Sequence, residues 1–187
     1  MNAEIENNKT LDRYFYPLGE VFKGRLFQIP DYQRGYAWEQ KQCQDLLDDL
    51  SMLDGDAQQH FFGTLILHDT GSISAFMDAN QQLCRNYHVI DGQQRLTTSL
   101  IYLDLLHREL QPFDPNAAVQ LKNNYVWIED RTGFSNPRLI LNRDTHAFFQ
   151  QAVLESKPGL KRRIRSHARL IAAQQFFSEH LQQKREA

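Results

Sequence analysis

The sequence predicts a mixed α/β domain, in which helices flank a β-sheet. Residues 61–68 and 87–90 are apolar runs with β-branched residues, which is typical of buried strands. Residues 39–53 and 94–110 instead carry apolar side chains at helical spacing. Hydrophobic residues make up 41% of the 187 residues, which is enough for a real core.

The first third of the chain is expected to form two helices and a strand. Residues 10–21 predict a short helix with three apolar residues near one face. Residues 26–30 predict a short strand that ends at a proline. Residues 39–53 predict a strong helix with aspartates off its apolar stripe. The apolar positions are Leu11, Phe15 and Leu18 in the first helix and Cys43, Leu46, Leu47, Leu50 and Leu53 in the second.

A polar stretch and a second strand–helix pair follow the run at residues 61–68. Residues 69–86 are polar and contain a glycine, so they predict a long loop or a hairpin connection. Residues 87–90 predict a central strand. Residues 94–110 predict a long helix with leucines at near-heptad spacing, and Pro112 and Pro115 break this pattern.

The last third is expected to add two strands and two helices. Residues 125–129 and 138–141 are the candidate strands. Asp144 can cap a helix that continues to about residue 155. Residues 166–182 predict the final helix.

The expected elements predict a sheet domain over residues 1–142 and a helical extension over residues 143–187. The last helix runs almost to the final residue without glycine or proline. We therefore expect the extension to be the start of a longer C-terminal region.

Composition excludes several classes of protein. The net charge of −2 and the pI near 6.4 give no global nucleic-acid signature, although a local basic patch is compatible with them. No apolar run is long enough to span a bilayer, and the polar, acidic N-terminus does not resemble a secretory signal. Two cysteines, Cys43 and Cys84, suggest neither a disulfide framework nor a zinc site, so we expect reduced thiols in the cytoplasm.

The strand at residues 87–90 runs into an Asp91-Gly92 corner, and a helix is expected to begin there. The first turn of a helix leaves backbone N–H groups without partners, and a glycine lets a ligand approach them closely. Arg95 adds a planar guanidinium suited to phosphate or carboxylate. The corner therefore predicts an anion site. Asp91 either caps the helix, or it holds Mg²⁺ or orients a water beside a bound phosphate.

A second polar and aromatic cluster follows the strand at residues 26–30. Tyr32, Gln33 and Arg34 stand in a turn that leads to Trp38. These side chains either pack under a loop or form a wall that stacks a base and adds a second phosphate-binding arginine. If the two preceding strands are neighbours, Arg34 and Arg95 are expected to converge on one pocket.

Other candidate sites are weaker. A basic cluster either forms a solvated helix face or contacts nucleic-acid phosphates. The seven histidines show no zinc-ligand spacing, and no GxSxG motif is present. The basic cluster consists of Lys157, Lys161, Arg162, Arg163, Arg165 and Arg169.

Three motifs occur in order along the chain. They are Phe27-x-Ile29-Pro30-x-Tyr32-Gln33-Arg34-x-Tyr36-x-Trp38, then Phe61-Phe62-Gly63-Thr64-Leu65, then Ile90-Asp91-Gly92-Gln93-Gln94-Arg95-Leu96-Thr97-Thr98. Together they resemble the GmrSD restriction endonuclease N-terminal domain family, whose hallmark is the DGQQR motif. The resemblance covers about residues 11–141. It implies a ParB/sulfiredoxin-like fold, a mixed α/β unit whose strand–helix corner binds nucleotide phosphates.

The resemblance also implies a function in DNA restriction and anti-phage defence. In that family the domain binds and hydrolyses nucleoside triphosphate (NTP), or senses DNA modification, and regulates DNA cleavage. The nuclease is commonly a C-terminal HNH-type domain. This chain shows no HNH-like arrangement, so we expect the nuclease on another segment or on a partner.

The family motifs assign roles by position. The residues expected to act in catalysis are Asp91, Gln94 and Arg95, and Asp91 is also the expected Mg²⁺ ligand. The residues expected to contact the nucleotide are Gly92, Gln93, Thr97, Tyr32, Gln33 and Arg34. The expected partners are DNA, either modified or not, and the nuclease; a homo-oligomer is compatible with this assignment.

Three functions remain open on the sequence. The first is an NTP-binding and NTP-hydrolysing regulatory domain. The second is a non-catalytic module that binds DNA or senses its modification, through the basic cluster and the Tyr32/Trp38 wall. The third is an interaction scaffold without turnover, against which the two intact Gln-Arg motifs argue.

Overall fold

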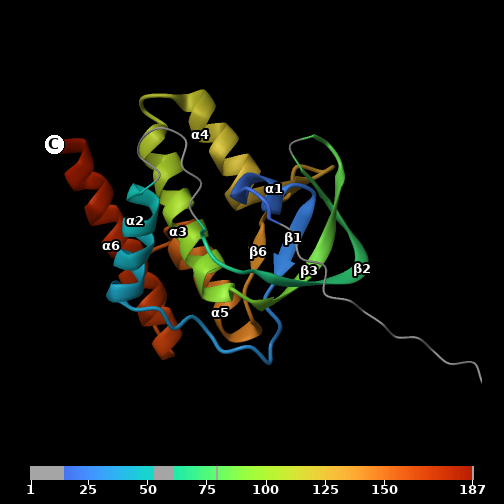
Figure 1. The fold of residues 1–187 in the computed structure, drawn as a ribbon, viewed down its shortest axis with the longest axis horizontal. Helices are drawn as coiled ribbons and strands as arrows, with labels where there is room; N and C mark the ends of the chain where they lie inside the picture. The colour runs from blue at the N-terminus through green and yellow to red at the C-terminus, as the bar shows by residue number, and fades with distance from the viewer. Residues whose placement is uncertain (1–14, 53–60, 79, 187) are drawn as a thin grey trace, which may run out of the picture.

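A computed structural model describes residues 15–52, 61–78 and 80–186, and its centre is a six-stranded mixed sheet (Figure 1). The strand order is β5-β4-β2-β3-β1-β6. The strands are β1 (Arg25–Gln28), β2 (Ile66–Met77), β3 (Leu83–Asp91), β4 (Trp127–Asp130), β5 (Ser135–Pro137) and β6 (Leu139–Ile140). The predicted mixed α/β class with flanking helices and a C-terminal helix is confirmed.

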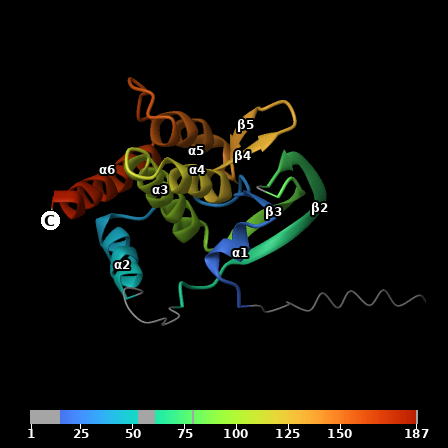
Figure 2. The ribbon, with the colours of Figure 1, turned by 90° about the horizontal axis from the view of Figure 1, so that it is seen from above.

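Helices α2, α3, α4 and α6 lie on one side of this sheet (Figures 1 and 2). The helices are α1 (Leu18–Phe22), α2 (Gln40–Ser51), α3 (Gln93–Leu110), α4 (Pro115–Leu121), α5 (Arg143–Phe148) and α6 (Arg165–Glu186), with π-helical turns η1 (Lys122–Val126) and η2 (Phe149–Leu154). Part of the helix expected at residues 10–21 lies outside the described residues.

The sheet has a parallel half and an antiparallel half. Strand β1 pairs in parallel with both β3 and β6, so that Phe27 lies opposite Tyr87 on one side and Leu139 on the other. Strands β2, β4 and β5 continue the sheet in antiparallel pairs. The carboxyl ends of β3, β1 and β6 therefore meet at one edge, which is where open α/β sheets commonly bind ligands.

Helix α3 forms the centre of the core. Its Leu100 and Ile101 are fully buried, in one cluster with Phe27 of β1. Phe177 of α6 belongs to the same cluster, and its ring centroid lies 5.3 Å from that of Tyr102 on α3. The division expected at residue 142 remains a prediction, and the helices on both sides of it share this core.

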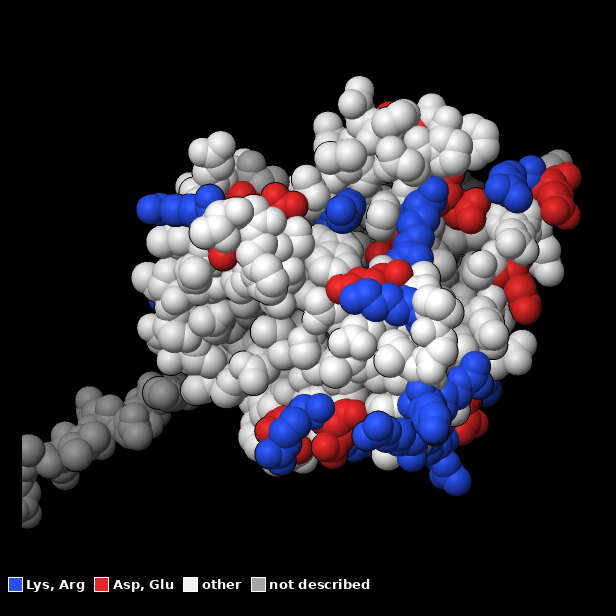
Figure 3. Space-filling model, turned by 180° about the vertical axis from the view of Figure 1, so that it is seen from behind, with Lys and Arg blue, Asp and Glu red and all other residues white. Residues whose placement is uncertain are grey.

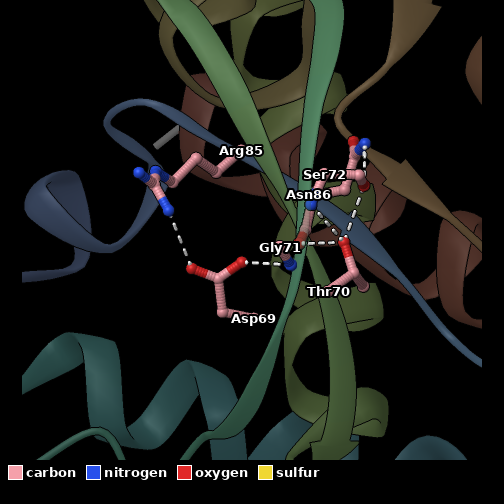
Figure 4. Close-up of polar contacts among 6 residues, drawn as sticks. All are labelled: Asp69, Thr70, Gly71, Ser72, Arg85 and Asn86. Carbon is pink, nitrogen blue, oxygen red and sulfur yellow. Dashed lines mark hydrogen bonds and ion pairs between the residues drawn. The ribbon is translucent and has the colours of Figure 1, made fainter.

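Strands β2 and β3 form a long hairpin, which is one of the two alternatives expected for the polar stretch at residues 69–86. The register of the two strands shifts between Asp69 and Ile73, and polar side chains form hydrogen bonds at this shift (Figure 4). Asp69 accepts hydrogen bonds from the backbone of Gly71 at 2.8 Å and from Arg85 at 3.3 Å. Thr70 donates to the backbone oxygen of Asn86 at 2.9 Å. The Gly71 N–H lowers the pKa of Asp69 below its usual range.

The strand expected at residues 61–68 begins later than the sequence indicated. Strand β2 starts at Ile66 and continues to Met77, and the preceding residues 61–65 belong to no strand. Gly63 there has a φ of +119°, which the apolar pattern does not reveal. Phe61 is 66% exposed, so the apolar run is not buried throughout.

Two helix starts also differ from expectation. Pro115 does not merely break the preceding helix, because it opens α4, where the Asp114 side chain accepts from the backbone of Ala117 at 2.9 Å. Asn142 is the N-cap residue of α5, and Asp144 lies inside the helix. The short strand β5 was not expected, and its Pro137 suits the edge of a sheet.

Arg138 is a buried charge between the sheet and the helices. Its side chain is 1% exposed and donates to the backbone oxygens of Phe22 at 3.1 Å, Arg25 at 3.3 Å and Asn123 at 3.0 Å. Burial lowers the pKa of the guanidinium. A single side chain therefore ties the segments around α1, β1 and η1 to the start of β6.

None of the helices in the described part of the chain is both long and apolar enough to cross a membrane.

Candidate functional site

The candidate site lies where the carboxyl ends of β3, β1 and β6 meet. Gly92 follows β3 and is the N-cap residue of α3, with a φ of +87°. A Cβ at this position would lie 2.9 Å from the backbone oxygen of Thr64, so both the conformation and the space require glycine. Gly92 also has no side chain with which to cap the 18-residue helix α3.

Asp91 is exposed and does not cap α3. Its Oδ1 accepts a hydrogen bond from the backbone N–H of Gly92 at 2.8 Å. The helix-cap alternative for this residue is therefore wrong, because Gly92 occupies the N-cap position. The first turn of α3 keeps N–H groups that no side chain at the N-cap satisfies.

The tandem glutamines attach the polar loop after β1 to the start of α3. Gln94 accepts from the backbone N–H of Ala37 at 2.7 Å and donates to the backbone oxygen of Gly35 at 3.3 Å. Gln93 donates to Gln33 and to the backbone oxygen of Arg34, both at 3.3 Å. The two Gln-Arg motifs thus come together, and both amides face the loop.

Further hydrogen bonds extend this attachment. Gln33 donates to the backbone oxygen of Ile90 at 2.9 Å, and Asn142 donates to the backbone oxygen of Gln33 at 2.9 Å. Tyr36 and Thr98 hydroxyls lie 2.8 Å apart. Because Thr98 already donates to its own helix at 2.8 Å, Tyr36 is the donor of that pair. Burial raises the pKa of Tyr36 well above its usual range and keeps this donor protonated.

Arg95 leaves the first turn of α3 in a different direction from the loop-binding amides. Its guanidinium carbon lies 6.0 Å from the ring centroid of Trp38 and 5.8 Å from that of Phe62. A Cβ at Gly63 would lie 2.0 Å from its Nη1, so only glycine leaves room for the guanidinium. Residues 61–65, the middle motif of the sequence, therefore shape the position of Arg95.

Arg34 has different neighbours. It is exposed and lines a small cavity of about 10 Å³ together with Gln93, Thr97 and Asn142. Thr97 donates its hydroxyl to the backbone oxygen of Gln93 at 2.8 Å. This volume is at the limit for one water molecule, so the interior of the corner is packed and a larger ligand must bind at its surface. Tyr32 is 75% exposed at this surface.

Two polar atoms of the corner retain unused hydrogen-bonding capacity. Oε1 of Gln93 and Nε of Arg95 are buried and have no partner among the described residues. Buried polar atoms normally find a partner, and an exception is a place where a ligand or water can bind.

Asp91 is the residue of the corner that could hold Mg²⁺. The part of the chain that the structure describes contains no group of three histidine, cysteine or acidic residues that could hold a metal. A site for Mg²⁺ commonly uses only one or two carboxylates together with phosphate oxygens and water. The exposed Asp91 carboxylate fits that kind of site.

The sequence indicated the segments of this site better than the individual roles. Gln94 was expected in catalysis and Gln93 on the nucleotide, but both amides hold the loop here. Gly63 and Phe62 received no role, although their motif is part of the family resemblance. Both residues lie next to Arg95 because the segment at residues 61–65 passes the first turn of α3. The local sequence pattern does not show this contact between distant segments.

The fold and the site define a mixed α/β domain with a glycine-centred strand–helix corner at the carboxyl ends of three parallel strands. The chain belongs to the GmrSD restriction endonuclease N-terminal domain family, whose model matches residues 18–186. It is therefore a domain of a restriction-system protein. No curated protein matches the chain.

Proposed function

We propose that this domain binds a nucleoside triphosphate at the Asp91–Arg95 corner and hydrolyses it to regulate DNA restriction. The observation that carries the proposal is the start of α3. An 18-residue helix begins there without a side-chain N-cap, and a half-buried arginine stands in its first turn. The N-terminal partial charge of such a helix, its N–H groups and a guanidinium all attract phosphate.

The charges of the corner suit a triphosphate with its metal ion. A carboxylate beside a phosphate repels it unless a cation lies between them, so Asp91 fits this site as a ligand of Mg²⁺. Bound Mg²⁺ would neutralise negative charge on the phosphates. Arg95 would stabilise the charge that develops on the transferred phosphoryl group. The catalytic role expected for Gln94 remains a prediction.

Calorimetric titration of the purified chain with ATP, GTP, CTP and UTP in the presence of Mg²⁺ tests the proposal. We expect at least one of them to bind, and phosphate release measured in parallel to follow the nucleotide that binds. A chain that binds none of the four would overturn the proposed function. Binding without phosphate release would retain the site and reject turnover.

DNA contact is a second candidate function, and the segment before α6 favours it. Lys161, Arg162 and Arg163 are exposed on this segment, and Arg165 is exposed at the first position of α6. Figure 3 shows basic side chains along the lower edge of the molecule, with acidic side chains among them. Lys157 and Arg169 of the same sequence cluster are instead paired with Glu155 and Glu39. Four exposed cations in close succession suit a phosphate backbone.

Replacing Lys161, Arg162 and Arg163 with alanine is expected to lower the affinity for DNA. It should also make this affinity less dependent on the salt concentration. The slope of log K against log salt should fall by about three, one for each lost phosphate contact. Fluorescence anisotropy of labelled duplex DNA at several salt concentrations measures this slope. The matched control removes three exposed cations elsewhere, Lys23, Lys41 and Arg131, and should leave the slope unchanged. Equal slopes for both triple variants would reject this DNA surface.

A further inference from the structure

A groove separates the start of α2 from one face of α6. It has a volume of about 360 Å³, within the range of roughly 300–1,000 Å³ that small-molecule pockets usually have. Its lining residues come from the segment before α2 and from successive turns of α6. Those that matter below are Trp38, Glu39, Arg169, Ala172, Phe176 and Glu179.

The walls of the groove suit a flat apolar ring. Trp38 contributes an aromatic side chain from one side and Phe176 contributes another from α6. Ala172 and Ala173 lie between the larger side chains of α6, and their small size keeps the groove open. Aromatic rings bind planar heterocycles by stacking, and this stacking does not depend on which nucleobase is bound.

The charges of the groove oppose phosphate. Glu39 and Glu179 line it, and its one arginine, Arg169, is ion-paired with Glu39. The remaining carboxylate makes the groove negative, so a phosphate would be repelled there. N–H donors on the edge of a neutral ring would instead meet carboxylate acceptors.

Trp38 connects the groove with the proposed phosphate site. It lines the groove, and its ring centroid also lies 6.0 Å from the guanidinium carbon of Arg95. A ligand with a neutral ring at one end and negative charge at the other could therefore place its ring in the groove and its charge near Arg95.

We infer that the groove between α2 and α6 is the base-binding subsite of the nucleotide. This inference rests on the proposed function, and it adds a subsite formed by Trp38 of the first motif together with α6, which lies outside the three motifs. The groove would supply affinity for the base, whereas the corner at Gly92 would supply affinity for the phosphates.

The test compares a nucleoside triphosphate with inorganic triphosphate, which has the phosphates and lacks the base. Ala172 is exposed, so leucine at this position fills the groove without disturbing the core. In calorimetry with Mg²⁺, Ala172→Leu should weaken binding of the nucleotide about tenfold or more and leave inorganic triphosphate within about twofold. Ala168→Leu is the matched control, because Ala168 is exposed on the same helix and does not line the groove.

A second measurement uses Trp38 as a reporter. The chain has two tryptophans, so Trp127→Phe leaves Trp38 as the only one. A stacked base should change its fluorescence, and inorganic triphosphate should change it much less. The inference is overturned if Ala172→Leu binds the nucleotide as tightly as the unmodified chain, or loses both ligands equally. If the unmodified chain binds neither ligand, the proposed function itself fails, and the subsite fails with it.

Discussion

Replacing Arg95 with alanine is expected to reduce NTP turnover by about 100-fold or more while the protein stays folded. The guanidinium stands in the first turn of α3, half-buried between Trp38 and Phe62, and its Nε has no partner among the described residues. A positive charge held in this half-buried position stabilises the negative charge that develops on the phosphoryl group more strongly than a positive charge in open solvent does. Phosphate release at saturating nucleotide measures the effect.

The control for this experiment is Arg131→Ala, because Arg131 is exposed on the turn between β4 and β5. It removes the same charge far along the chain from the corner and should leave turnover unchanged. Arg95→Lys keeps the charge but loses the planar fork, so it should recover only part of the activity. Unchanged turnover in a folded Arg95→Ala protein would remove Arg95 from the catalytic role.

Gly63 offers a second way to test the position of Arg95. An alanine there would place its Cβ 2.0 Å from Nη1 of Arg95 and must displace the guanidinium. Gly71 also has a positive φ, but nothing lies within 4 Å of a Cβ at that position. Turnover should therefore fall in Gly63→Ala and persist in Gly71→Ala. An equal loss of turnover in the two variants would mean that backbone strain, not the position of Arg95, controls activity, and full turnover in both would mean that this position does not control it.

Replacing Arg138 with methionine is expected to lower the free energy of unfolding by about 3–5 kcal/mol. Methionine has a similar length but no donor, so the buried backbone oxygen of Phe22 and the partly buried backbone oxygens of Arg25 and Asn123 would lose hydrogen bonds. The midpoint and slope of urea unfolding, followed by circular dichroism, give the free energy.

Arg131→Met provides the matched control for Arg138. The same substitution at an exposed position should change the free energy of unfolding by less than about 0.5 kcal/mol. Arg138→Lys keeps a charge but has one donor group instead of a fork, so an intermediate loss is expected. If Arg138→Met were as stable as the unmodified protein, the three carbonyl contacts would not contribute to stability.

The sequence predicted the long helices best. Residues 39–53 and 94–110 correspond to α2 and α3, and the final helix extends only a few residues beyond residues 166–182. In these segments the helical spacing of apolar residues coincides with the face that the core buries. Strand boundaries were less accurate, because strand pairing depends on distant segments. The run at residues 61–68 illustrates this, since its first half packs near α3 and only its second half joins β3.

The site was predictable in its location and less so in its internal contacts. A glycine corner before a helix is visible in the sequence, and β1 and β3 are indeed neighbours, as the pairing of the two motifs requires. The sequence does not show that Gln93 and Gln94 bind the backbone of the loop after β1. Nor does it show that α6 contributes a wall next to Trp38. Both features arise from contacts across more than 50 residues of chain.

The glutamine contacts have a mechanical consequence. Because Gln94 forms hydrogen bonds with the backbone of both Ala37 and Gly35, the loop after β1 is fixed to α3 and not only to the sheet. Helix α3 also packs against α6 through Tyr102 and Phe177. A displacement of α6 would therefore also displace α3, and the loop after β1 and the corner at Gly92 would move together with it. A partner that binds α6 would therefore change the position of the corner at Gly92.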